Sequence, residues 1–316
     1  MRIVITGADG QLGQELVRTL AGQGVVIGST LSDLDITTPD CAERLAALAP
    51  DWVVHAAAAT DVDGCEREPA RAMAVNAEGT YRVADGCRRV GAGLVYLSTD
   101  YVFDGRKGSA YIEEDAPMPL SIYGRSKLEG EQAARTLGSR WLIIRTAWLY
   151  GPCGSNFVKA ILKKAAAGEE LRVVDDQVGS PTYAPDLANA VSLLLSRNLT
   201  GVYHVTNSGC CSWYEFAREI LRLTGSISTP LSRITSRELN RPAPRPACSV
   251  LENAAWQAAG LPPLRPWPEA LAAMLAALRE GDSSDSRILH SSDQSRPTTR
   301  PLDHSTTRQC DFWQSG

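Results

Sequence analysis

The sequence predicts an α/β fold. Three observations lead to this prediction: short β-branched runs alternate with helix-length segments, a glycine-rich turn follows the first run, and the alternation loosens after residue 150. Strands that alternate with helices form right-handed crossovers, and such crossovers build a parallel sheet covered on both faces. We therefore expect a Rossmann-type, doubly wound parallel sheet with a smaller, mostly helical lobe.

The first half of the chain supplies the expected sheet. Its buried strands are predicted at residues 2–6, 25–27, 52–56, 93–97 and 141–145. After the first strand and its turn, Leu12, Leu16 and Leu20 fall on one helical face at a spacing of four. These elements predict a dinucleotide-binding domain over residues 1–150.

The second half is predicted to leave the sheet and partly return to it. Helices are expected at 156–167, 185–195, 213–223 and 268–279, and strands at 171–174 and 202–205. We assign residues 171–205 to the Rossmann domain, and residues 151–170 and 206–280 to a substrate-binding lobe over the carboxyl ends of the strands. Residues 281–316 are rich in Ser and Thr without an apolar period, which predicts a disordered tail.

Composition argues against several classes of function. With 32 Lys+Arg and 36 Asp+Glu the net charge is −4, so no positive field would hold nucleic acid or anionic lipid. No run approaches the roughly 18 consecutive apolar residues of a membrane-spanning helix. The eight cysteines form no C-x-x-C pair, which is typical of free thiols in a reducing cytosol. We expect a cytoplasmic protein that binds neither nucleic acid nor a membrane.

The segment Gly7-Ala8-Asp9-Gly10-Gln11-Leu12-Gly13 has a G-x-x-G-x-x-G spacing between the first strand and its helix. Glycines allow close backbone approach, and the helix N-terminus offers N–H groups and partial positive charge to a pyrophosphate. The alternative is a tight turn that only holds the helix on the sheet. The position between strand and helix is the one that a dinucleotide site requires, so we favour dinucleotide binding.

The coenzyme is expected to be NADPH, with NADH also allowed. About 20 residues beyond the turn, many NAD-specific sites carry an acidic residue for the adenosine ribose. This chain has Gly28-Ser29-Thr30 there, so no carboxylate would repel a 2′-phosphate. Asp33 and Asp35 follow; they contact the adenosine end or are solvated loop acids.

Tyr123 and Lys127 lie four residues apart at a predicted helix start, so their side chains share one face. An ammonium beside a phenol lowers the phenol's pKa, which is about 10 when unperturbed. Such a Tyr can exchange a proton with a carbonyl or an alcohol. Upstream, the buried strand leads into Thr99, whose hydroxyl can bind the same substrate oxygen. A Tyr and a Lys at this spacing are also common as a surface cation packed on a ring, but the preceding strand favours catalysis.

With these motifs the sequence resembles the extended short-chain dehydrogenase/reductases and, within them, the dTDP-4-dehydrorhamnose reductase family. The resemblance runs from Met1 to about residue 280. Its motifs appear in family order: TGADGQLG, LDIT, HAAAATDVDGCE, the Asn of VNAEG, LSTDYVFDG, YGRSKLEGE, RTAWLYG, DDQVGSPTY and RPAPRPACSVL. The combination of STDYVFDG, YGRSKLEGE and RTAWLYG is specific to this group. Two departures are Ala59, where family members often carry an aromatic residue or His, and the extension beyond residue 280.

The resemblance implies roles for individual residues. Tyr123 would donate the proton, Lys127 would be its electrostatic partner and a ligand of the nicotinamide ribose, and Thr99 would complete the triad. The residues implied at the coenzyme are Gly7, Gly10, Gln11, Leu12, Gly13, Asp35, Ile36, Ala58, Ala59, Thr60, Tyr123 and Lys127. Those implied at the sugar nucleotide are Thr99, Asp100, Trp148 and Arg245.

Two of the implied positions carry alternatives. Arg145 would contact the dTDP diphosphate or form a structural salt bridge, and Trp148 would face the sugar nucleotide or belong to the core. Some relatives bind Mg²⁺ at a dimer contact, which makes Glu15 a candidate metal ligand and a homodimer a candidate assembly.

The implied reaction is the NADPH-dependent reduction of the C4 ketone of dTDP-4-dehydro-β-L-rhamnose to dTDP-L-rhamnose, for cell-surface polysaccharide biosynthesis. One alternative is a sugar-nucleotide dehydratase or epimerase of the same superfamily. Dehydratases generally show Thr-Asp-Glu after this strand, whereas here Tyr101 follows Asp100, which favours plain reduction. The other alternative is a non-catalytic NADP-binding subunit resembling the regulatory subunit of methionine adenosyltransferase; the intact triad favours an enzyme.

Overall fold

A computed structural model describes the backbone of residues 1–291 and the side chains of residues 1–280. Its centre is a six-stranded sheet in the order β10-β5-β4-β3-β1-β2, with every neighbouring pair parallel. The strands are β1 (Arg2–Thr6), β2 (Val25–Ser29), β3 (Trp52–His55), β4 (Gly93–Thr99), β5 (Trp141–Thr146) and β10 (Gly201–His204). The predicted doubly wound sheet is confirmed, and the carboxyl ends of its strands meet at one edge.

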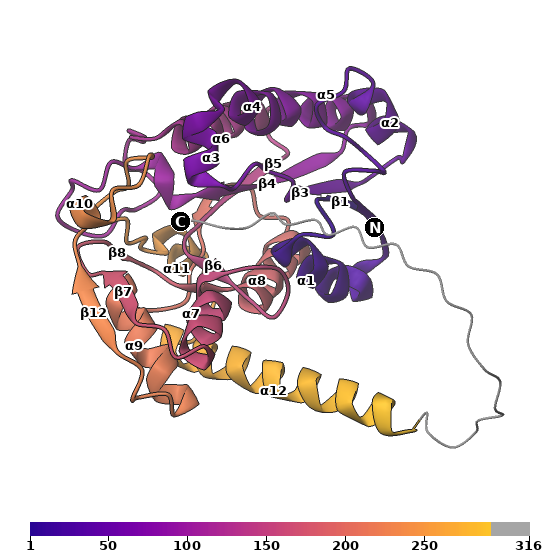
Figure 1. The fold of residues 1–316 in the computed structure, drawn as a ribbon. Coiled ribbons are helices and arrows are strands. Elements are labelled where there is room, and N and C mark those ends of the chain that lie inside the picture. Colours follow the sequence, from indigo (N-terminus) through magenta and orange to yellow (C-terminus); the bar gives the residue numbers. More distant parts are fainter. Residues whose placement is uncertain (292–316) are drawn as a thin grey trace, which may run out of the picture. The chain divides into compact units, whose positions relative to one another are not determined.

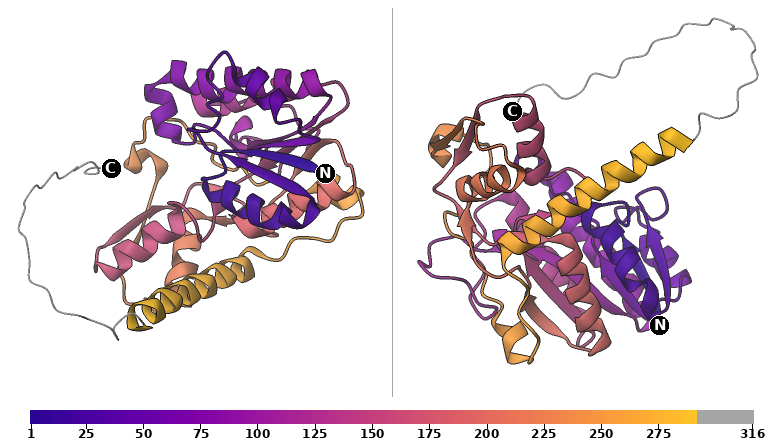
Figure 2. Two further views of the ribbon diagram at one scale, coloured as in Figure 1. Left: turned by 90° about the vertical axis from the view of Figure 1, so that its right-hand side faces the viewer. Right: turned by 90° about the horizontal axis from the view of Figure 1, so that it is seen from below.

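Helices cover both faces of this sheet (Figure 1). On one face lie α1 (Gln11–Leu20) and α8 (Ala184–Ser196), where Leu16 and Leu187 belong to one apolar cluster with Ile3. A second cluster, containing Leu45 and Val83, covers the other face. The helices on that face include α2 (Cys41–Ala47), α5 (Thr80–Val90) and α6 (Ile122–Arg135). Figure 2 shows the same layers from two further directions. Burial on both faces explains why these strands read as continuous apolar runs.

Short helical segments complete the sheet region. They are the 3-10 turns η1 (Ala21–Gln23) and η3 (Asp100–Val102), the helices α3 (Val62–Arg67) and α4 (Pro69–Met73), and the π-helical segment η2 (Ala74–Gly79). Apart from η1, these segments follow the carboxyl ends of β3 and β4. They therefore follow the sheet edge at which ligands bind in open α/β folds.

The region after β5 combines helices with short strands. Its helices are α7 (Phe157–Ala166), α9 (Trp213–Thr224), α10 (Ser236–Leu239), α11 (Ala254–Ala258) and α12 (Trp267–Ser291). Its strands are β6 (Leu149–Tyr150), β7 (Leu171–Val174), β8 (Val178–Gly179), β9 (Thr182–Tyr183), β11 (Cys211–Ser212) and β12 (Leu231–Ile234). They pair two by two, β6 with β9, β7 with β12 and β8 with β11.

One part of the predicted return to the central sheet is wrong. Residues 184–204 do rejoin it through α8 and β10, but β7 pairs with β12 in a separate sheet. The local pattern of β7 correctly predicts a strand. It does not identify the strand that β7 pairs with. The sheet edge beside β5 is occupied by β10, so β7 is not paired there.

The last helix runs to Ser291, so it extends into the range that was predicted as a tail. Residues 292–316 lie outside the described part of the chain. Met1–Ala277 packs as one compact unit, and the described residues from Leu278 onward are not part of it. The division of the first unit into a dinucleotide-binding domain and a lobe stays a prediction.

The cysteines within the described residues are all unpaired, in agreement with the predicted free thiols; Cys310 lies outside that range. Among the same residues, none of the helices combines the length and the apolar character that crossing a bilayer requires.

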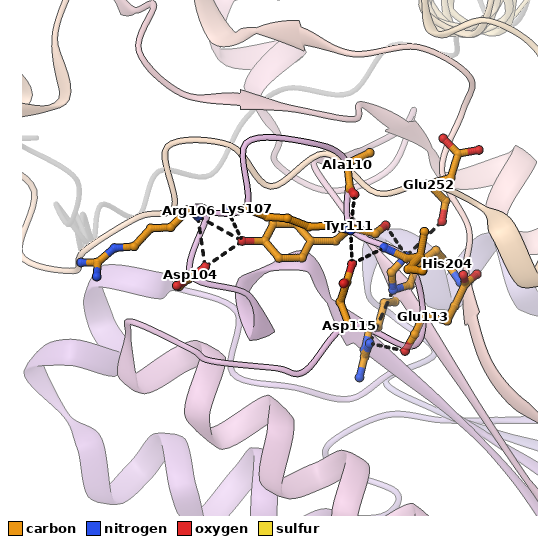
Figure 3. A network of polar contacts seen from close by, with 11 residues as sticks. Asp104, Arg106, Lys107, Ala110, Tyr111, Glu113, Asp115, His204 and Glu252 are labelled. Atoms are coloured by element: carbon orange, nitrogen blue, oxygen red, sulfur yellow. Dashed lines mark hydrogen bonds and ion pairs between the residues drawn. The ribbon is translucent and has the colours of Figure 1, made fainter.

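A polar network fixes the loop between β4 and α6 onto β10 (Figure 3). The Tyr111 hydroxyl donates to Asp104 at 2.7 Å, and His204 Nδ1 lies 3.1 Å from the carbonyl oxygens of Tyr111 and Glu252. Because Nδ1 faces two acceptors, it carries the imidazole proton. The backbone N–H of His204 donates to Glu113 at 2.8 Å. Burial lowers the pKa of His204 to about 3, so this imidazole is neutral.

His204 should therefore make the fold acid-sensitive. Its pKa rises from about 3 in the folded protein to an ordinary value near 6.5 on unfolding, so its contribution is complete above pH 6.5 and is lost as the pH falls toward 3. We expect the unfolding free energy of the wild type to fall by about 2 kcal/mol more than that of His204→Asn between pH 7.5 and pH 4.5. Urea unfolding at both pH values measures this difference. Equal pH dependence in the two proteins would contradict the assignment.

Candidate active site

The glycine-rich turn joins β1 to α1 at the carboxyl edge of the sheet. Gly7 has φ +67°, and a Cβ there would lie 2.8 Å from the backbone N and Cα of Ala57. At Gly13 a Cβ would lie 2.0 Å from the Gly7 carbonyl oxygen, so glycine alone lets the helix approach the turn this closely. Gly10 is the N-cap of α1, and no side chain of the described residues caps this helix. An uncapped N-terminus beside such a turn fits a pyrophosphate.

Two side chains of the turn make contacts within the fold. Leu12 is buried in the core, so only its backbone can meet a dinucleotide. The side-chain oxygen Oε1 of Gln11 accepts a hydrogen bond from Asn156 Nδ2 at 2.9 Å, which joins the start of α1 to the N-cap of α7. The turn thus stands against the second half of the chain, and its predicted coenzyme contacts stay predictions.

A methyl group at Gly13 should disrupt this turn. We expect Gly13→Ala to lower the unfolding free energy by about 1–3 kcal/mol, because the new Cβ displaces the Gly7 carbonyl. Binding of NADPH, followed by its fluorescence, should weaken in parallel. Gly22→Ala is the matched control, since a Cβ at Gly22 would meet no atom within 4 Å. Wild-type stability in Gly13→Ala would contradict the close approach.

The end of β2 holds the turn without presenting a carboxylate. The Ser29 carbonyl accepts from the Ala8 N–H at 3.1 Å. Asp33 instead closes its own loop, accepting from the Thr30 N–H at 2.9 Å and from the Thr30 hydroxyl at 2.8 Å. These bonds hold the pKa of Asp33 below its usual range. Ser29 and its neighbours in β2 therefore carry no negative charge that would repel a 2′-phosphate on the adenosine ribose of a coenzyme.

The two residues expected at the adenosine have structural partners. Asp35 accepts from the N–H and the hydroxyl of Thr37, at 2.8 and 2.7 Å, which lowers the pKa of its carboxyl group. Ile36 is buried, and a Cβ at Gly79 would lie 2.9 Å from its Cδ1. Asp35 therefore shapes a turn and Ile36 fills the core, and contact of either with adenosine stays a prediction.

Asn76 fixes the loop after β3, which contains Ala58, Ala59 and Thr60. Its Oδ1 accepts from the Ala59 N–H at 2.8 Å, and its Nδ2 donates to the Ala59 carbonyl at 3.0 Å and to Ser126 Oγ at 2.9 Å. Asn76 is buried in the π-helical segment η2, a geometry that often occurs at functional sites. It ties the loop to α6. In the sequence, Asn76 stands out only as part of the family motif VNAEG. The contacts of its side chain could not be predicted from residue spacing.

A cavity of about 260 Å³ lies beside this loop. Ala58, Ala59 and Thr60 line it together with Cys65 from α3 and residues of α4. The predicted coenzyme contacts after β3 therefore border open space, as a binding loop requires.

Thr99 and Tyr123 meet at the carboxyl edge of the sheet. Tyr123 lies in the first turn of α6, whose N-cap Ser121 accepts from the Gly124 N–H at 3.1 Å. Thr99 ends β4, and its hydroxyl lies close enough to the Tyr123 phenol to lower the phenol's pKa against the effect of burial. The same hydroxyl donates to Asp100 Oδ1 at 3.1 Å. The structure thus brings together two of the three residues of the predicted triad.

The expected effect of Lys127 on the phenol is not found. Lys127 Nζ donates to the Leu97 carbonyl at 2.6 Å and lies 4.3 Å from the centroid of the Tyr96 ring. Burial lowers the pKa of Lys127 to about 7, and Glu131 only partly opposes this shift. Burial also raises the pKa of Tyr123 well above 10, with the Thr99 hydroxyl as the opposing influence. The expected acidic phenol is wrong for this arrangement, because desolvation dominates and the ammonium faces the sheet.

Asp100 lies behind Thr99 rather than at an open surface. It is 1% exposed, and its Oδ2 accepts from Ser249 Oγ at 2.5 Å. Burial raises its pKa to about 6, against the opposing hydrogen bonds from Ser249 and Thr99. In this arrangement Asp100 orients the Thr99 hydroxyl, and its predicted contact with a sugar stays a prediction.

Arg145 forms a structural salt bridge, one of the two roles expected for it. Its Nε and Nη2 each lie 2.8 Å from the Glu131 carboxylate, and the two side chains are 2% and 0% exposed. Arg245 pairs with Asp63 at 3.0 and 3.1 Å, and Arg241 contacts the same carboxylate. Arg245 retains 16% exposure and is the better placed of the two predicted phosphate ligands.

Trp148 follows β5 with φ +47°, an uncommon conformation for a residue other than glycine. Its ring stacks on Trp213 with centroids 3.6 Å apart and planes 9° apart. A Cβ at Gly179 would lie 2.5 Å from the Trp148 ring, so Gly179 makes room for it. Trp148 also packs on the buried cluster around Phe103. Its strained backbone favours a functional role, and its packing agrees with the core alternative.

The predicted metal site lacks support. The Glu15 carboxylate, on α1, is bound by Arg18 at 2.6 Å. Among the described residues, no three His, Cys, Asp or Glu side chains gather in a way that could hold a metal ion. A carboxylate already neutralised by a guanidinium is a poor start for a Mg²⁺ site.

Comparisons with known proteins agree with this geometry. Residues 1–280 match the family described as RmlD substrate binding domain. A dTDP-4-dehydrorhamnose reductase of Mycobacterium tuberculosis is 44% identical over 295 residues, which are 91% of this chain and 96% of that protein. The spore coat polysaccharide biosynthesis protein SpsK of Bacillus subtilis is 46% identical over 272 residues, which are 85% of this chain and 95% of that protein.

Two solved structures share the fold closely. A crystal structure of a dTDP-4-dehydrorhamnose reductase from Clostridium acetobutylicum has a TM-score of 0.85 at 42% identity, covering 88% of this chain and 100% of that chain. The enzyme of the same name from Bacillus anthracis, in complex with NADP, has a TM-score of 0.83 at 37% identity, covering 87% of this chain and 99% of that chain.

Proposed function

The chain belongs to the RmlD substrate-binding domain family, and we propose that it reduces the C4 ketone of dTDP-4-dehydro-β-L-rhamnose to dTDP-L-rhamnose with NADPH. The observation that carries this proposal is the proximity of the Thr99 hydroxyl to the Tyr123 phenol at the carboxyl edge of the sheet, in a chain 44% identical to a dTDP-4-dehydrorhamnose reductase. The protein is an oxidoreductase of dTDP-rhamnose biosynthesis, which serves cell-surface polysaccharides.

The residues of the glycine turn fit the coenzyme. Gly7, Gly10 and Gly13, with the uncapped start of α1, would hold its pyrophosphate. When bound, NADPH supplies the hydride. The preference for NADPH over NADH is supported by the neutral end of β2 at Ser29 and by the NADP complex of the Bacillus anthracis enzyme.

Tyr123 acts as the general acid. Because burial raises its pKa, the phenol holds its proton at neutral pH and can donate it to the oxygen that becomes the product hydroxyl. The Thr99 hydroxyl, whose single proton is donated to Asp100 in this structure, would turn that proton to the same oxygen as negative charge develops there. Lys127, whose pKa is lowered to about 7, would contact the ribose and aid return of a proton to Tyr123.

The dTDP-sugar would lie against the second half of the chain. Arg245 would contact its diphosphate, since a guanidinium binds phosphate oxygens in a bidentate way. Asp63 holds that guanidinium in place and would share it with the phosphate. Trp148 would offer its ring to the sugar nucleotide beside Trp213.

A single assay tests the proposal. NADPH absorbance is followed with enzymatically made dTDP-4-dehydro-β-L-rhamnose, without substrate, and in reverse with dTDP-L-rhamnose and NADP⁺. We expect one NADPH consumed per dTDP-L-rhamnose formed, with the product identified by mass spectrometry. Tight NADPH binding without turnover would support the regulatory-subunit alternative. Loss of water from a dTDP-hexose would support the dehydratase alternative.

A further inference from the structure

Thr146 ends β5 directly beside Thr99, the last residue of β4. The two residues are register partners in a parallel pair. Register partners point to the same face of a sheet, so both hydroxyls lie on one face at the carboxyl edge. The Thr99 hydroxyl donates to Asp100 and lies near the Tyr123 phenol. Thr146 Oγ1 is buried, yet within the described residues it has no hydrogen-bond partner.

An unpaired buried hydroxyl is unfavourable. Valine has nearly the same shape and would leave no polar group unpaired, so threonine costs stability at this position unless something else bonds to it. The chain is strained close by as well, since Trp148 has φ +47° two residues later. Unpaired groups and strain of this kind gather at ligand sites.

Within the part of the chain whose side chains are described, the other buried unpaired atoms belong to Gln23, Arg82 and Glu113, and none of these residues ends a strand of the central sheet. Thr146 differs because it stands at the edge where Thr99 and Tyr123 meet. In the strand order, β5 lies on the far side of β4 from β1 and its glycine turn. A group bound at Thr146 would therefore belong to the part of the bound ligands that lies farthest from the pyrophosphate.

We propose that Thr146 Oγ1 is a ligand-binding hydroxyl of the active site. It would bond to a carbonyl, amide or hydroxyl group that arrives beside Thr99, because a threonine hydroxyl both donates and accepts. Two ligands carry such groups at this end, the carboxamide of the nicotinamide ring and the keto sugar. The inference rests on the proposed function, and the experiment distinguishes the two ligands.

The test compares Thr146→Val, which removes only the hydroxyl, with Thr146→Ser, which keeps it. Thr224→Val is the matched control, because the Thr224 hydroxyl donates to the Ile220 carbonyl at 2.9 Å on α9. Thermal unfolding gives Tm, fluorescence titration gives the Kd of NADPH, and steady-state kinetics gives KM for dTDP-4-dehydro-β-L-rhamnose. Two of these readouts concern ligands and one concerns the fold.

We expect Thr146→Val to keep or raise Tm while one ligand constant weakens about 10-fold. A weaker NADPH Kd would identify the carboxamide, and a higher KM at unchanged Kd would identify the sugar. Thr146→Ser should stay close to the wild type. Thr224→Val should lower Tm and change neither constant.

Wild-type constants in Thr146→Val, or a fall in Tm as large as in Thr224→Val, would overturn the inference, since the hydroxyl would then be idle or paired within the fold. Absence of turnover in the wild type would instead refute the proposed reaction. The NADPH titration does not depend on turnover, so the two failures remain distinguishable.

Discussion

Tyr123→Phe is expected to lower kcat by about 1,000-fold. The variant removes only the phenolic oxygen, so the ring still packs against Tyr101, whose centroid lies 5.6 Å away. The Kd of NADPH should stay within about two-fold of the wild type, since a Tyr that supplies a proton contributes mainly to the transition state. Single-turnover measurements at saturating substrate, with fluorescence titration of the coenzyme, give both quantities.

The matched control is Tyr203→Phe, which removes the hydroxyl of a buried Tyr on β10. It should retain kcat. A Tyr123→Phe enzyme with a native rate would exclude Tyr123 as the general acid. A variant that lost coenzyme binding together with rate would show that the phenol holds the ligand instead of supplying a proton.

The fold was predictable to the level of the central sheet because its strands carry their own signal. Strands 2–6 and 171–174 match β1 and β7 residue for residue, since both are short β-branched runs with clear limits. The partner of β7 was not predictable. Pairing with β12 depends on which sheet edges are free, a property of the whole chain that the segment LRVV does not contain.

The site likewise contains some features that local sequence predicts and others that depend on the folded chain. The glycine turn and the Thr99–Tyr123 contact follow from local geometry, because each residue stands at the end of a strand or the start of a helix. The direction in which the Lys127 side chain extends does not follow from local geometry. Lys127 follows Tyr123 by four residues on α6, but its Nζ extends to the Leu97 carbonyl, 30 residues away in the sequence. Asn76 likewise acts through contacts to Ala59 and Ser126 that only the folded chain creates.

Arg145→Met should lower the unfolding free energy by about 3–5 kcal/mol. It leaves the fully buried Glu131 carboxylate without its guanidinium, with Ser98 Oγ as a remaining donor at 2.7 Å. Most of that cost comes from an uncompensated charge and little from the lost attraction. Urea unfolding of the variant at neutral pH measures it.

The double variant Arg145→Met with Glu131→Met separates the two roles considered for Arg145. Replacing both charges by apolar groups removes the unpaired carboxylate, so the double variant should recover most of the stability lost by Arg145→Met. Because Arg145 is 2% exposed and both nitrogens nearest Glu131 are bonded to it, KM for the dTDP-sugar should change by less than about three-fold. A folded double variant whose KM rose about 10-fold or more would instead place this guanidinium on the diphosphate, because removal of one charged hydrogen bond to a ligand has that size.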